Sequence, residues 1–338
     1  MSDEAQLLAR VENGVGHLTL NRPRAINALT HRMILGIRDA LGHWRTDPRV
    51  HAVVIDGAGD RGLCAGGDIR GLRENVLAER PNDTRDFWRD EYTLCAVIAN
   101  YPKPYVALMD GVTMGGGVGV ASHGSIRVVT ERSKVAMPET RIGLAPDVGG
   151  TWLLSRAPGA IGAYLGLNAA TMTGADAVWC GFADHLVPSD SLPKLRDALL
   201  AGDDPATAVA RFAVDPGPAP LKAQWRWIDE CYSAATVPEI VERLHEMETD
   251  AATAAAAELD DLCPTSLVTT HLAIRRARMR NDLRDVLDQE YRTSSWLLDR
   301  PDLVEGIRAR VVDKDNAPRW NPTTIAEVDI TEVERVVL

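Results

Sequence analysis

Residues 50–72 read VHAVVIDGAGDRGLCAGGDIRGL and point most directly to the fold class. The run from Val50 to Ile55 is β-branched and almost continuously apolar, as in a strand covered on both faces. A glycine-rich loop follows it, and a helix is expected from about Asp68. Upstream, VENGVGHLTLNRP (11–23) predicts two strands around an Asn-Gly turn, and Thr30 can cap a helix with apolar positions at 33, 34, 37, 40, 41 and 44. Strand, helix, strand and glycine loop predict an α/β fold.

Downstream, residues 73–90 are charged and contain Pro81, so we expect a solvated excursion followed by a helix over 91–100. Strands are then expected at YVALMDG (105–111), IRVVTE (126–131) and from Lys134, with a small-residue helix at GGGVGVASHG (115–124). Beyond about residue 188 nearly every segment reads as helical, and the prolines of VDPGPAP (214–220) must interrupt the helices. We therefore expect a core over residues 1–190 and a C-terminal helical region over 191–338.

Composition excludes several classes of protein. The 338 residues are 45% apolar and 25% charged, which fits a globular protein rather than a disordered one. The 48 acidic and 37 basic residues give a net charge of −11, so no overall positive field attracts nucleic acid. Five widely spaced cysteines without a CxxC pair fit buried thiols in a reducing compartment. With neither a leader pattern nor a long apolar run, we expect a cytoplasmic protein without a membrane partner.

Two glycine clusters can present backbone amides to a ligand. Gly66 and Gly67 precede Asp68 at the end of the glycine-rich loop, where adjacent glycines let amide hydrogens point outward. Residues 115–119 (GGGVG) lie between an expected strand and an apolar helix, where free amides can stabilise a developing oxyanion. A tight turn and close helix packing are the alternative explanations. The second cluster, residues 115–119, contains neither a dinucleotide fingerprint nor a phosphate loop.

A third segment carries carboxylates. Glu139 lies among apolar residues in MPET (137–140), and Asp147 follows in the glycine-flanked PDVGG. A buried carboxyl group prefers to be neutral, so its pKa should rise toward the range useful for proton transfer. A capping box or a surface salt bridge is the alternative. The scattered histidines form no metal-binding pair and no GxSxG motif is present, so metal and serine-nucleophile chemistry are not expected.

Four motifs together resemble the crotonase superfamily: NRPRAINALT, CAGGDIR, YPKPYVALMDGVTMGGGVG and MPETRIGLAPDVGG. The resemblance extends from about Val15 to Trp320. Within the superfamily, the chain looks most like the 3-hydroxyisobutyryl-CoA hydrolases. It implies a spiral of ββα units followed by a C-terminal helical region. Members of the superfamily bind acyl-CoA thioesters with the carbonyl oxygen between two backbone N–H groups. By motif matching these donors are Gly67 and Gly116, and the resemblance implies further substrate contacts from Arg24, Asp68 and Ile69.

The carboxylates distinguish the subfamilies. Hydratases of the superfamily use two glutamates, of which one matches Glu139 and the other falls at Gly119 in this chain. The hydrolase pattern instead combines Glu139 with Asp147 and Glu91. It implies that Glu139 activates water or attacks the thioester itself, and either role remains open. Asp147 would orient the substrate hydroxyl or water, Glu91 would shape the acyl pocket, and Ala145 stands where a bulkier apolar residue is expected.

The resemblance implies hydrolysis of a short-chain 3-hydroxyacyl-CoA, most simply 3-hydroxyisobutyryl-CoA in valine catabolism. It implies no cofactor, because CoA is part of the substrate. One alternative is an enoyl-CoA isomerase or hydratase of the same superfamily. Another, of a different class, is a non-catalytic acyl-CoA-binding protein, against which the retained Glu139 and Asp147 argue. Helical tails in this superfamily often build homo-oligomers, although such a tail can equally fold over its own core.

Overall fold

The computed structural model describes residues 5–338, whose contacts form two compact units. The first contains residues up to Asp68 together with 90–135 and 172–220. The second contains residues 69–89, 136–171 and 221–338. The predicted division into a core over residues 1–190 and a helical region over 191–338 is a different matter. Grouping by contacts does not test it, so the boundary at residue 190 stays a prediction.

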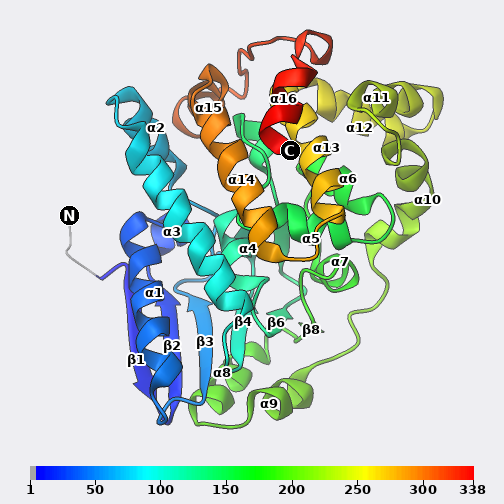
Figure 1. Cartoon of the computed structure of the whole chain (residues 1–338). Coiled ribbons are helices and arrows are strands. Elements are labelled where there is room, and N and C mark those ends of the chain that lie inside the picture. The colour runs from blue at the N-terminus through cyan, green and yellow to red at the C-terminus, as the bar shows by residue number, and fades with distance from the viewer. Residues whose placement is uncertain (1–4) are drawn as a thin grey trace. The chain divides into compact units, whose positions relative to one another are not determined.

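A six-stranded sheet forms the centre of the first unit, in the order β1-β2-β3-β4-β6-β8 (Figure 1). Its strands are β1 (Leu7–Glu12), β2 (Val15–Leu20), β3 (Ala52–Gly57), β4 (Tyr105–Met109), β6 (Ile126–Val129) and β8 (His185–Leu186). Only β1 and β2 are antiparallel, and the other neighbours are parallel. Asn13 and Gly14 join the first two strands with φ of 47° and 82°, as a tight hairpin turn requires. The predicted hairpin and buried strands are confirmed.

Helices cover both faces of this sheet. Helix α1 (His31–Thr46) begins where Thr30 accepts a hydrogen bond from the Met33 amide, and its Trp44 ring lies over Gly16 of β2. On the opposite face, α8 (Leu192–Leu200) and α9 (Pro205–Phe212) form one apolar cluster with strand residues that include Val15. The side chains of successive strand residues point to opposite faces of a sheet. Because α1 packs at Gly16 while α8 and α9 pack at Val15, these helices lie on opposite faces.

A smaller sheet carries the second glycine cluster. It pairs β5 (Val112–Met114) with β7 (Lys134–Ala136), and β5 leads into α4 (Gly116–Ala121). The predicted small-residue helix is confirmed, whereas β5 was not expected, because it is only three residues long and directly precedes the glycines. The short helix α7 (Gly174–Trp179) completes the first unit's helices.

The expectation of a solvated excursion over 73–90 is wrong. Helix α2 spans Ile69–Leu77, and α3 spans Pro81–Ala99 rather than beginning at residue 91. Proline lacks an N–H group that the first helical turn does not need, so Pro81 starts this helix instead of interrupting the chain. Phe87 and Trp88 are buried at 5% and 1% exposure, which shows that this charged stretch contributes to the core.

The remainder of the second unit is helical, which was expected beyond about residue 188 but not for α5 and α6. After the turn η2 (Glu139–Ile142), its helices are α5 (Gly150–Arg156), α6 (Ile161–Leu167), α10 (Pro220–Tyr232), α11 (Val237–Glu246), α12 (Asp250–Asp260), α13 (Pro264–Arg278), α14 (Leu283–Leu298), α15 (Pro301–Ile307) and α16 (Ile330–Val337). The prolines of 214–220 separate α9 from α10. In the described part of the chain, no helix is both long and apolar enough to span a membrane.

Candidate functional site

The loop after β3 runs beside β5 and brings the two glycine clusters together. The Cys64 amide donates to the Val112 carbonyl (3.1 Å), and the Met114 amide donates to the Cys64 carbonyl (3.0 Å). A Cβ atom built on Gly66 would lie 3.2 Å from the Met114 oxygen and 3.7 Å from the Gly116 nitrogen. With φ of 109°, Gly66 also has a backbone conformation that side chains disfavour. The close approach therefore depends on glycine at this position.

The backbone amides of Gly67 and Gly116, which we call the oxyanion pair, lie close together. A Cβ atom built on Gly116 would lie 3.3 Å from the Gly67 nitrogen. Among residues 5–338, neither amide donates to another backbone group. Two such N–H groups can stabilise the oxyanion of a tetrahedral intermediate, and their proximity agrees with the predicted role.

Glu91 lies at the same place. It comes from the part of α3 that belongs to the first unit and is 2% exposed. Its Oε1 atom lies 2.5 Å from the position that a Gly116 Cβ would occupy. The structure thus places Glu91 beside Gly116, whereas its predicted role in the acyl pocket stays a prediction.

Cys64 supports the turn beneath the oxyanion pair. The Gly66 amide donates to its sulfur (3.3 Å), and its thiol lies 3.5 Å from the Gly66 carbonyl oxygen. Burial raises the pKa of Cys64 to about 12, and the nearby Glu91 charge also raises it. A thiol with this pKa is not a nucleophile at neutral pH, so we assign Cys64 a structural role.

Asn27, which sequence analysis did not single out, connects the loop 22–28 to the loop after β3. Its side chain accepts from the Arg22 amide (2.9 Å) and donates to the carbonyls of Ala58 (3.0 Å) and Gly62 (3.1 Å). The residue is fully buried and has φ of 55°. A buried asparagine with these bonds tolerates the left-handed backbone and satisfies groups in both loops.

Of the predicted substrate contacts, Asp68 forms an ion pair with Arg22. The Arg22 guanidinium donates to the Asp68 carboxylate (2.8 Å) and to the Ala28 carbonyl (2.5 Å). Arg24 is exposed on the turn η1 (Pro23–Ala25), and it forms no ion pair within residues 5–338. Ile69 is the first residue of α2 and is half-buried.

We expect Asn27→Ala to lower the free energy of unfolding by about 2 to 4 kcal/mol, because several buried polar groups lose their partners. Urea denaturation measures this change. Asn13→Ala is the matched control, since Asn13 has a similar φ of 47° but is exposed and donates to the Leu200 carbonyl (2.9 Å) at the surface. Equal losses in the two variants would show that the buried Asn27 hydrogen bonds contribute no more than this exposed one.

Glu139 and Asp147 lie in one segment of the second unit. Glu139 begins η2 directly after β7, and its carbonyl accepts from the Leu144 amide (3.1 Å). Their exposures are 6% and 5%, so both carboxylates are largely removed from water. The predicted burial is confirmed, whereas their catalytic roles stay predictions.

Comparison with known proteins agrees with these features. The model of the enoyl-CoA hydratase/isomerase family matches residues 15–337. The chain belongs to this family, the crotonase superfamily. It is 39% identical over 337 residues to the mouse (Mus musculus) mitochondrial 3-hydroxyisobutyryl-CoA hydrolase, with 97% of this chain and 87% of the relative covered.

Two solved structures are similar to this crotonase-family chain. A carnitinyl-CoA dehydratase from Mycobacterium thermoresistibile is 48% identical, with a TM-score of 0.95 and coverage of 99% of this chain and 97% of the other. An enoyl-CoA hydratase from Rhodobacter sphaeroides is 42% identical, with a TM-score of 0.91 and coverage of 98% and 97%. The predicted crotonase fold is confirmed, and the chain is an acyl-CoA enzyme of this superfamily.

A further buried carboxylate of the crotonase-family chain, Glu290 in α14, was missed from the sequence. Its oxygens accept from the Gly149 amide (2.6 Å) and from the amide (2.9 Å) and hydroxyl (2.5 Å) of Thr151. Burial raises the pKa of Glu290 to about 8, and the charge of Asp147 adds to the rise. One sequence feature could have revealed it. Glu290 lies on the same face of α14 as residues that are buried, which include Val286, Leu287, Thr293 and Leu297.

This shift predicts a pH-dependent stability. Glu290 has a pKa of about 8 when folded against an ordinary 4.5, so the folded chain binds this proton more tightly than the unfolded chain. The resulting stabilisation is complete below about pH 4.5 and is lost as the pH rises through about 8. We expect Tm to fall less steeply between pH 6 and 9 in Glu290→Gln than in the wild type. Parallel Tm curves would contradict the shift.

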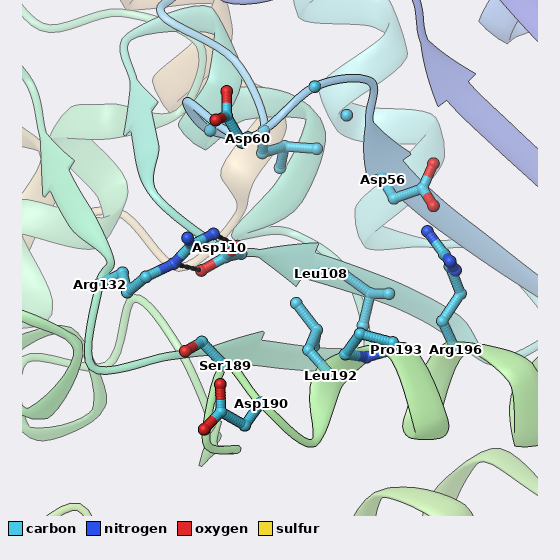
Figure 2. A pocket seen from close by; sticks show the side chains of 14 residues that line it. Asp56, Asp60, Leu108, Asp110, Arg132, Ser189, Asp190, Leu192, Pro193 and Arg196 are labelled. Atoms are coloured by element: carbon cyan, nitrogen blue, oxygen red, sulfur yellow. Dashed lines mark hydrogen bonds and ion pairs between the residues drawn. The ribbon is translucent and has the colours of Figure 1, made fainter.

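The first unit also contains a hollow of about 300 Å³ near the ends of β3 and β4 (Figure 2). Arg132 donates to Asp110 there, and Asp56 is paired with His17 (Nε2 to Oδ2, 3.0 Å). Figure 2 shows the Arg196 side chain pointing toward Asp56. None of the predicted site residues lines this hollow, so we leave it out of the acyl-CoA chemistry.

Proposed function

We propose that this chain hydrolyses short-chain 3-hydroxyacyl-CoA thioesters, with 3-hydroxyisobutyryl-CoA as its substrate and 3-hydroxyisobutyrate and CoA as products. The observation that carries the choice is α4, which reads GGVGVA and has no carboxylate at Gly119. A hydratase of the predicted two-glutamate type needs one there. The mouse relative is named a 3-hydroxyisobutyryl-CoA hydrolase, which supports the same reaction.

In the proposed reaction the thioester oxygen accepts hydrogen bonds from the oxyanion pair. Glu139 either takes a proton from water that attacks the carbonyl carbon or attacks that carbon itself, giving an anhydride that water then opens. The carbon–sulfur bond breaks in both cases, and CoA leaves as a thiolate. Asp147 orients the substrate hydroxyl or the water, while Glu91 shapes the acyl pocket.

Hydration of an enoyl-CoA is the second candidate. The two solved structures described above carry dehydratase and hydratase names. Glu91 also provides a carboxylate beside Gly116, close to the amides that would hold the carbonyl oxygen. A carboxylate at this position offers a second acid or base that does not depend on residue 119.

One pair of assays distinguishes the candidates. Free thiol release from 3-hydroxyisobutyryl-CoA is followed with a thiol-reactive dye, and the enoyl absorbance of crotonyl-CoA is followed in parallel. We expect thiol release and no change in the enoyl absorbance. Loss of the enoyl absorbance without thiol release would replace the hydrolase by the hydratase.

A further inference from the structure

The turn that contains Asp147 has an unfavourable backbone. The Gly150 amide donates to the Asp147 carbonyl (2.6 Å), which closes a turn over residues 147–150. Its two central residues have φ of 53° (Val148) and 78° (Gly149). Glycine adopts such values readily, whereas a β-branched residue does so only when its surroundings impose them. The Asp147 turn, as we call residues 147–150, therefore needs support from outside itself.

Glu290 provides that support. One oxygen binds the amide of Gly149, inside the turn, and the other binds the amide and hydroxyl of Thr151, just beyond it. The side chain is 2% exposed, so water does not compete for these donors. Hydrogen bonds to a carboxylate are shorter and stronger than those between neutral groups. A single buried group thus binds the chain on both sides of Gly150.

The arrangement persists when Glu290 is protonated. A proton on Oε1 can be donated to the Thr151 hydroxyl, and both oxygens keep a lone pair for the two backbone amides. A glutamine cannot do the same, because it has one acceptor oxygen and one NH2 group. Whichever way the glutamine amide faces, one backbone N–H of Gly149 or Thr151 meets another donor.

Asp147 itself is close enough to act on Glu290. Burial is the main cause of the raised pKa of Glu290, and the Asp147 charge is a further one. A shift of the turn would therefore move the Asp147 carboxylate as well as the backbone that Glu290 binds.

We propose that Glu290 is a positioning residue that holds the strained Asp147 turn through the amides of Gly149 and Thr151 and thereby fixes the direction of the Asp147 carboxylate. The inference rests on the proposed function, because it takes Asp147 as part of the acyl site. In this proposal Glu290 touches no substrate and acts through Asp147.

The test compares Glu290→Gln with two other variants. Glu290→Gln should lower kcat for thiol release by about 10- to 100-fold, because a small misplacement of an orienting group is costly, while KM stays within about threefold. Thr151→Val loses the hydroxyl bond but keeps both backbone bonds, so its kcat should change by less than about threefold. Hydrogen exchange over residues 147–151 should speed up in Glu290→Gln and stay near the wild-type rate in Thr151→Val.

Asp176→Asn is the matched control for loss of a buried carboxylate. Asp176 is 2% exposed and accepts from the amide (3.1 Å) and hydroxyl (2.7 Å) of Thr173, at the start of α7 in the first unit. We expect this variant to lower Tm as Glu290→Gln does, with kcat unchanged. Should Glu290→Gln not fold, Glu290→Asp is measured in its place, because it keeps a carboxyl group with a shorter reach.

The outcomes separate the inference from the proposed function. Unchanged exchange over 147–151 would overturn the support of the turn by Glu290, whatever reaction the chain catalyses. Faster exchange with the same kcat as Asp176→Asn would overturn the positioning role alone. A wild-type chain that releases no thiol would refute the proposed hydrolysis, and the exchange measurement would still decide whether Glu290 holds the turn.

Discussion

Replacing Glu139 by Gln is expected to lower kcat for thiol release by about 10²- to 10⁴-fold, the usual contribution of a positioned acid or base. Glutamine has nearly the same shape but can neither take a proton from water nor attack the thioester. Because the carboxylate acts mainly in the transition state, KM and binding of the CoA ester should stay close to their wild-type values. Steady-state kinetics and calorimetric titration with the substrate measure the two effects separately.

Glu131→Gln is the control for this substitution. Glu131 is an exposed glutamate eight positions upstream that accepts from the Ser189 amide (3.0 Å), and it has no role in the proposed reaction. Its removal should leave kcat unchanged. Near-normal turnover in Glu139→Gln would remove Glu139 from the mechanism and leave the proposed hydrolysis without its principal carboxylate.

Replacing Gly116 by Ala is expected to lower kcat/KM by about 10²- to 10³-fold, the loss that follows removal of one oxyanion donor. The new methyl group would lie 2.5 Å from Oε1 of Glu91 and 3.3 Å from the Gly67 nitrogen, so it would enter the space that the carbonyl oxygen needs. Glu91 can move aside because the clash involves the end of its side chain. The φ of Gly116 lies outside the left-handed region, so the variant should still fold.

Gly42→Ala provides the comparison. Gly42 lies in α1, and a Cβ atom there would meet nothing within 4 Å. Alanine is the better helix former, so this variant should gain up to about 1 kcal/mol of stability without a change in kcat/KM. If Gly116→Ala retained wild-type kcat/KM while folding normally, the oxyanion pair would have to lie elsewhere.

Sequence patterns correctly predicted the structural elements that depend only on neighbouring residues. The Asn13-Gly14 turn, the Thr30 cap and the buried strand near residue 53 each follow from neighbouring residues, and each is present. The start of α3 was predicted wrongly because a proline such as Pro81 can either end a helix or begin one. Proline ends a helix from within but suits its first turn, and only the burial of Phe87 and Trp88 decides between them.

The candidate site likewise contains residues that the sequence predicted and residues that it did not. Its glycines and carboxylates were predicted from the sequence because four separate motifs agree with one family, although each cluster alone also fits a turn, helix packing or a salt bridge. Asn27 and Arg22 were missed, since an asparagine and an arginine in a loop have many ordinary roles. Their contacts with Gly62 and Asp68 lie 35 and 46 positions away in the chain.

The sequence by itself determined the superfamily and the α/β core and predicted the residues offered to the thioester, because periodicity, turn chemistry and motif order are properties of short segments. Only the tertiary structure decided that Glu91 stands beside Gly116 and that Glu290 supports the Asp147 turn. The Glu290 contact spans 141 positions, and a glutamate in an amphipathic helix carries no local sign of its partner. Packing chooses such partners, since a buried charge must find donors wherever the fold places them.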